Sequence, residues 1–145
     1  MLILIVSGCT NREVIEHHYT YFGENDLWSA EYKLDSTVTV SKHSDKINSA
    51  SNRDSVMTIT YKKELSDLKK IKDMTISYEY AGGSSAQSYH YDDGASPANN
   101  KFILKSSDTG SVIENEDESI LVTINIDGEI QTIELMNTKK SSSNK

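Results

Sequence analysis

The sequence predicts an all-β fold, an immunoglobulin-like antiparallel β-sandwich of seven or eight strands with one short helical turn. Three observations lead to this prediction. Segments in which apolar and polar residues alternate recur along the chain, clusters of Gly, Asn, Asp and Ser separate them, and a single segment has helical spacing. In this sandwich we expect Trp28 to be an aromatic residue of the core. The cysteine pair of antibody domains is absent. A lipocalin-like β-barrel is the alternative, because it is built from the same kind of short strands.

The clearest strand pattern covers residues 27–40. Even positions from Trp28 to Val40 are mostly apolar, and the odd positions between them are polar. Because successive side chains of a strand point to opposite faces, this pattern predicts one buried face and one exposed face. Fourteen residues are long for one strand, so we expect a bend or bulge near Asp35-Ser36.

The remaining strands are expected where shorter alternating or apolar runs occur, and polar stretches join them. Residues 62–72 carry Leu65, Leu68 and Ile71 at a spacing of three, which predicts one or two helical turns, possibly of the 3₁₀ type. The expected strands are 19–22, 54–61, 74–80, 87–91, 102–104, 120–126 and 129–136, and the expected loops include 41–53, 81–86, 92–100 and 106–119.

The last two strands form a hairpin whose register can be predicted. Asp127-Gly128 is a preferred pair for a two-residue type I′ turn. Partners across such a hairpin share a face, so the apolar half far from the turn should enter the core while the turn end protrudes. The predicted pairs are Ile126 with Glu129, Ile124 with Gln131, Val122 with Ile133 and Ile120 with Leu135.

Composition limits the classes of function. The chain has 145 residues, a net charge of −7 and an isoelectric point near 5.0, so it lacks the positive charge needed to hold nucleic acid. One cysteine excludes an internal disulfide and a cysteine-based zinc site. No cofactor motif and no nucleophile motif occurs, which favours a non-enzymatic protein.

Histidine and acidic residues do not predict a metal site. The four histidines, at positions 17, 18, 43 and 90, lack the spacing of metal-binding motifs. The segment from His90 to Gly94 contains Asp92 and Asp93, but turn chemistry explains these residues more simply than calcium binding does. The acidic stretch 114–118 is typical of a solvated loop.

Four tyrosines near the predicted hairpin around Gly82-Gly83 are candidate binding residues. Cross-strand packing in the core is one interpretation, since strands favour tyrosine. An exposed platform for a peptide or glycan is the other, because tyrosine combines an apolar ring with a polar hydroxyl. Burial distinguishes the two interpretations for Tyr78, Tyr80, Tyr89 and Tyr91.

The first nine residues are an apolar run that ends in Val6-Ser7-Gly8-Cys9. A branched apolar residue, two small residues and then cysteine resemble the lipobox of bacterial lipoproteins, which implies transfer of a diacylglyceryl group to the Cys9 sulfur and cleavage before Cys9. Residues 1–8 are then a truncated signal peptide, and 9–18 are the lipidated cysteine and a tether. The β-sandwich should cover 19–136, followed by a disordered tail at 137–145.

The chain as a whole resembles the small lipoproteins of Gram-positive bacteria. The lipobox, the tether and the segment from Gly23-Glu24-Asn25-Asp26-Leu27-Trp28 to Tyr32 carry this resemblance. It implies a lipid anchor on the extracytoplasmic face of the cell membrane and supplies no catalytic residue. We expect a non-enzymatic module that binds an envelope protein or peptide. The alternatives are a small-molecule or peptide binding protein with a barrel cavity, and an envelope enzyme.

Overall fold

The computed structural model describes residues 11–80, 83–93, 95–110 and 117–138. These residues form eight antiparallel strands and one 3₁₀ turn, so the all-β prediction is confirmed. The elements are β1 (Asn11–Glu24), β2 (Trp28–His43), β3 (Lys46–Tyr61), η1 (Leu65–Leu68), β4 (Asp73–Tyr80), β5 (Gly83–His90), β6 (Lys101–Thr109), β7 (Ile120–Ile126) and β8 (Glu129–Asn137).

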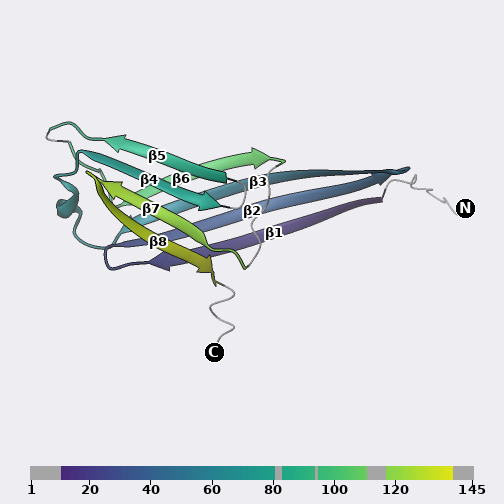
Figure 1. Ribbon diagram of the computed structural model, residues 1–145, viewed down its shortest axis with the longest axis horizontal. Coiled ribbons are helices and arrows are strands. Elements are labelled where there is room, and N and C mark those ends of the chain that lie inside the picture. The colour runs from purple at the N-terminus through teal and green to yellow at the C-terminus, as the bar shows by residue number, and fades with distance from the viewer. Residues whose placement is uncertain (1–10, 81–82, 94, 111–116, 139–145) are drawn as a thin grey trace, which may run out of the picture.

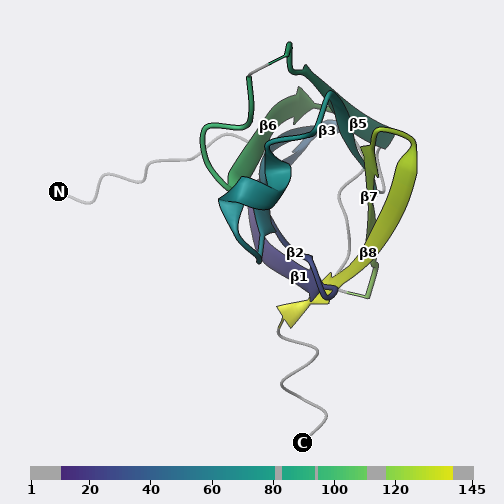
Figure 2. The same ribbon diagram turned by 90° about the vertical axis from the view of Figure 1, so that its left-hand side faces the viewer.

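The strands form one sheet in the order β5-β4-β7-β8-β1-β2-β3-β6. Its two halves, β5-β4-β7-β8 and β1-β2-β3-β6, face each other around the core (Figures 1 and 2). The outer strands β5 and β6 are bridged by the rings of Tyr89 and Phe102, whose centroids are 5.4 Å apart. The sheet is therefore almost closed, an arrangement that fits both the predicted sandwich and the barrel alternative.

A short ladder between β1 and β8 joins the two halves. It consists of two residue pairs, Tyr21 with Asn137 and Phe22 with Met136. Gly23 follows in β1, and a Cβ atom there would collide with the carbonyl oxygen of Glu134 in β8. Glycine is required here because no side chain fits between the two backbones.

Large side chains fill the space between the two halves. Tyr21, Trp28, Tyr32 and Tyr78 are almost completely buried, and their rings contact other aromatic rings. Aliphatic residues from β4, β7 and β8 pack opposite them. The alternation predicted for 27–40 is confirmed in the barrel, where Trp28, Ala30, Tyr32 and Leu34 face inward. Ser36, the next residue on the same face, is also buried.

Three strands continue well beyond the barrel and form what we call the arm (Figure 1). The arm consists of residues 11–18 of β1, 36–43 of β2 and 46–51 of β3, which remain paired with one another throughout. Neither β6 nor β8 follows them, because the ladder of β6 on β3 starts at Asn52 and that of β8 on β1 starts at Tyr21.

The arm corrects two expectations. Residues 11–18 belong to β1 rather than to a tether, and residues 41–53 are the ends of β2 and β3 joined at Ser44-Asp45, rather than a loop. Ser44 has a positive φ of 53°, as a tight turn requires. These strands could not be predicted from the sequence, because a ribbon that is exposed on both faces does not need apolar and polar residues in alternation.

Smaller differences concern strand ends. The register of β2 runs without interruption through Asp35 and Ser36, so the expected bulge is absent there. Residues 83–86 belong to β5, and β6 extends to Thr109. The 3₁₀ turn at Leu65–Leu68 confirms the short helix predicted within 62–72. The expected lipobox, most of the acidic stretch at 114–118 and residues 139–145 of the expected tail lie outside the described residues.

The β7–β8 hairpin confirms the predicted register, and all four predicted pairs are present. Asp127 and Gly128 have φ values of 50° and 94°, as a type I′ turn requires. Ile130, close to the turn, is 64% exposed, whereas Ile120 and Leu135 at the far end are buried. Among the described residues, no helix has the length and apolarity needed to cross a membrane.

Replacing Gly23 tests the joint between the two halves. We expect Gly23→Ala to lower the free energy of unfolding by about 3 kcal/mol, because the new methyl group meets the β8 backbone. Gly110→Ala is the control: nothing lies within 4 Å of its added Cβ, and only the strain of a positive φ remains, about 1 kcal/mol. Urea unfolding measures both. An equal or smaller loss for Gly23→Ala would contradict the role of this joint.

Candidate functional site

A charged pocket lies at the end of the barrel that carries η1, opposite the arm. Its volume is about 240 Å³, and two segments that meet at the barrel end form its walls. The N–H of Tyr91 donates to the carbonyl of Lys72 at 2.8 Å and so joins these segments. The pocket is lined by Lys69, Lys70, Ile71, Lys72, Tyr91, Asp92, Asp93 and Ala95.

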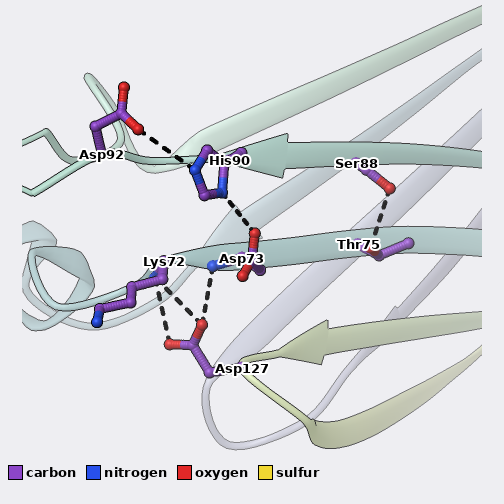
Figure 3. Close-up of polar contacts among 7 residues, drawn as sticks. All are labelled: Lys72, Asp73, Thr75, Ser88, His90, Asp92 and Asp127. Atoms are coloured by element: carbon purple, nitrogen blue, oxygen red, sulfur yellow. Dashed lines mark hydrogen bonds and ion pairs between the residues drawn. The ribbon is translucent and has the colours of Figure 1, made fainter.

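His90 lies beside this pocket between two carboxylates (Figure 3). It is the register partner of Asp73 across the β4–β5 ladder, and its Nδ1 is 2.7 Å from Asp73 Oδ1. Its Nε2 is 3.4 Å from Asp92 Oδ1. The hydrogen bond with Asp73, helped by the charges of both carboxylates, raises the pKa of His90 above its ordinary value of 6.5.

The turn between β7 and β8 fixes the start of β4 and therefore the position of Asp73. The Asp127 carboxylate accepts hydrogen bonds from the backbone N–H of Asp73 at 2.8 Å and of Lys72 at 3.2 Å (Figure 3). In return, the Asp127 N–H donates to the carbonyl of Asp73 at 2.9 Å. The sequence indicated Asp127 only as a turn residue, since nothing local shows which backbone its carboxylate will reach.

The hydrogen bonds around His90 can be compared with those of a catalytic base. Both ring nitrogens of His90 face carboxylates, so neither is directed at a hydroxyl group. The nearest strand hydroxyls, Thr75 and Ser88, are hydrogen-bonded to each other at 3.1 Å. A nucleophile paired with a base is therefore not formed by these residues. No cluster of three or more His, Cys, Asp or Glu side chains able to hold a metal ion occurs in the described part of the chain.

The four candidate tyrosines all pack in or against the core but lie in two groups: two on β4, and two at the end of β5 and just after it. Tyr78 is 1% exposed and Tyr80 packs against it near the arm, with ring centroids 5.8 Å apart. Tyr89 and Tyr91 lie at the pocket end and are partly buried against the core. Burial raises the pKa of both. Tyr91 is the one of the four that lines the pocket described above.

A buried arginine closes the barrel interior at the base of the arm. Arg53 is 1% exposed, and its guanidinium carbon lies 4.1 Å from the centroid of the Tyr80 ring. It donates a hydrogen bond to the Tyr32 hydroxyl and forms an ion pair with Asp108 at 3.3 Å. These interactions compensate for the removal of the charge from water.

The strand predicted from the sequence begins at Asp54, so the prediction does not include Arg53. Extending that strand backwards places position 53 on the same face as Met57, Ile59 and Tyr61, which are all buried. An arginine at a position that faces the core is therefore the feature of the sequence that could have indicated a buried charge. Only the register, which pairs Arg53 with Ser36 and Asp108, identifies its neighbours.

The other histidines lie on the arm. His18 bonds to Asp35 at 2.7 Å across the β1–β2 ladder, which raises the pKa of His18. His17 stacks on Tyr19, and His43 is exposed at the far end. These positions agree with solvated or edge histidines rather than with a shared site.

Comparison of the chain with models of protein families, with curated proteins and with solved structures gives no match.

Replacing the carboxylate partner of His90 tests the charged cluster. We expect Asp73→Asn to lower the pKa of His90 towards 6.5 and Asp92→Asn to lower it less, as followed by NMR titration of the ring. Because the pKa of His90 is raised in the folded state, the protonated ring stabilises the fold below pH 6.5, and this stability is lost as the pH rises through the pKa of His90 in the folded protein. Asp73→Asn should therefore weaken this pH dependence of the free energy of unfolding. Asp35→Asn, which should affect His18 alone, is the control.

Substitution of Arg53 tests the closure at the base of the arm. We expect Arg53→Lys to lower the free energy of unfolding by about 2 to 4 kcal/mol, because lysine loses the planar stack on Tyr80 and the hydrogen bond to Tyr32. Arg12→Lys, at the exposed arginine of the arm, should change it by less than about 0.5 kcal/mol. Equal effects in urea unfolding would contradict a structural role for Arg53.

Proposed function

We propose that this chain is a lipid-anchored, non-enzymatic binding module on the extracytoplasmic face of the cell membrane, attached through Cys9. One observation carries the proposal beyond the Val6-Ser7-Gly8-Cys9 motif. Strand β1 begins at Asn11, only two residues after Cys9, and it begins at the end of the arm farthest from the barrel (Figure 1). A lipid on Cys9 would therefore hold the arm end at the membrane.

The arm then works as a stalk instead of the flexible tether expected from the sequence. At about 3.3 Å per residue, the eight residues of β1 that belong to the arm, 11–18, span roughly 26 Å. Because β1 is paired with β2 over its whole length, the distance between anchor and barrel is set by folded structure. The charged pocket lies at the opposite end of the barrel, so it would face away from the membrane.

The pocket and its surroundings indicate the kind of partner. Three lysines and two aspartates line it, and His90 with its two carboxylates lies beside it. Such a surface suits a charged segment of an envelope protein or peptide, which would form ion pairs with both signs of charge. The barrel interior is filled by aromatic and aliphatic side chains, which supports recognition at the surface rather than inside the barrel.

A small charged molecule is the second candidate ligand, since charged side chains of both signs line the pocket. The pocket volume of about 240 Å³ is below that of most small-molecule sites, so the ligand would be compact. Lys70→Glu should weaken binding of either partner class. Titration with the isolated peptide or molecule would distinguish them.

The anchoring proposal is tested with Cys9→Ala in the producing cell. We expect the wild-type protein to partition into detergent and to take up a fatty-acid label, and Cys9→Ala to lose both properties. His43→Ala, an exposed change at the far end of the arm, should leave them unchanged. A free Cys9 thiol in the wild-type protein, found by mass spectrometry, would contradict the proposal.

A further inference from the structure

The most exposed large hydrophobic side chain in the described residues lies on the arm. Ile47 is 69% exposed, next to the turn that joins β2 and β3. On β1, which is separated from β3 by β2, Val14 and Ile15 are 51% and 38% exposed. Aliphatic side chains on a thin, protruding ribbon contribute little to the core, and the Ile47 side chain is left largely in contact with water.

Two lysines lie next to Ile47 in the β2–β3 ladder. We define the arm tip as residues 11–13 and 42–47. Lys42 is the register partner of Ile47, and Lys46 precedes it in the chain. With Arg12, these lysines outnumber the acidic residues of the tip, Glu13 and Asp45, whereas the whole chain has a net charge of −7. The tip is thus a local basic region on an acidic protein.

We infer that the arm tip binds the surface of a bilayer that contains anionic phospholipid, with Ile47 entering the headgroup region and Lys42 and Lys46 contacting lipid phosphates. This inference rests on the proposed function, because the anchor determines which end of the molecule meets the membrane. Covalent geometry keeps Cys9 within about 7 Å of Asn11, which pairs with Lys42. An acylated Cys9 would bring the tip to the headgroups.

The chemistry of the tip favours lipid over a second copy of the chain. An aliphatic side chain flanked by lysines matches the interface, where an apolar layer begins just below phosphate groups. The aliphatic stems of Lys42 and Lys46 can lie along the apolar layer while their ammonium groups stay among the phosphates. A second acidic copy would add repulsion between the barrels. The contact would fix the direction in which the arm stands.

The test places an environment-sensitive dye at the tip of the full-length lipidated protein. The dye is attached through Ile47→Cys, and in a second protein through Ile130→Cys at the opposite end, where the native side chain is 64% exposed. Both proteins are reconstituted in vesicles of phosphatidylcholine alone or with phosphatidylglycerol. Brominated lipids then report contact with the acyl region by quenching.

We expect strong quenching at position 47 in the anionic vesicles and none at position 130. Lys42→Glu and Lys46→Glu should each lower the inserted fraction at position 47 about fivefold relative to the free fraction. Lys69→Glu and Lys70→Glu, at the pocket end, should leave it unchanged. High salt should also weaken the quenching, because it screens the charges.

Equal quenching at positions 47 and 130 would overturn the inference, and so would the absence of any effect of the Lys42 and Lys46 substitutions. Shielding of the dye at position 47 without lipid would also overturn it, because this result would show that a second copy of the chain covers the tip. Failure of the proposed function appears separately. If Cys9 is not acylated, a thiol-reactive dye will label the wild-type protein, and this result does not depend on position 47.

Discussion

The close approach of β8 to β1 at Gly23 determines how the sheet closes. Only two residue pairs join the half-sheet β5-β4-β7-β8 to the half-sheet β1-β2-β3-β6, and the β8 backbone occupies the space that a side chain of residue 23 would need. This joint brings the inner faces of the two halves together and buries the aromatic core between them. Because this ladder is so short, the part of β1 that precedes Tyr21 is paired with β2 and not with β8, and residues 11–18 of it form one strand of the arm.

The fold thus separates two regions with different chemistry. The barrel end at η1 carries the pocket, the His90 cluster and the Asp127 turn that positions them. The arm carries exposed aliphatic and basic residues, and its strand β1 begins two residues after Cys9. Arg53 lies between these regions and closes the core where the arm begins, through its contacts with Tyr32, Tyr80 and Asp108. On this account, one end of the molecule contacts the membrane and the other end is available to a partner.

Local sequence predicted the barrel strands well and the arm poorly, for a physical reason. Alternation predicted the buried face from Trp28 to Leu34, and Asp127-Gly128 predicted the hairpin register. Both signals arise from neighbours in the chain. In the arm, the alternation predicted the strand only as far as Val40 of β2. Residues 11–18 and 41–53 have polar residues on both faces, so nothing in their pattern distinguishes a strand from a loop. The pairs Asp73 with His90 and Arg53 with Asp108 depend on register between strands, which local patterns do not reveal.

The central claim is that folded structure, rather than a flexible tether, connects Cys9 to the barrel. Amide hydrogen exchange of the lipidated protein on vesicles, read residue by residue by NMR, tests it most directly. The account predicts slow exchange at every second amide from Arg12 to His18, since these residues are paired with β2 on one side. Fast exchange at all amides of this segment, with protection starting only at Tyr19, would contradict it.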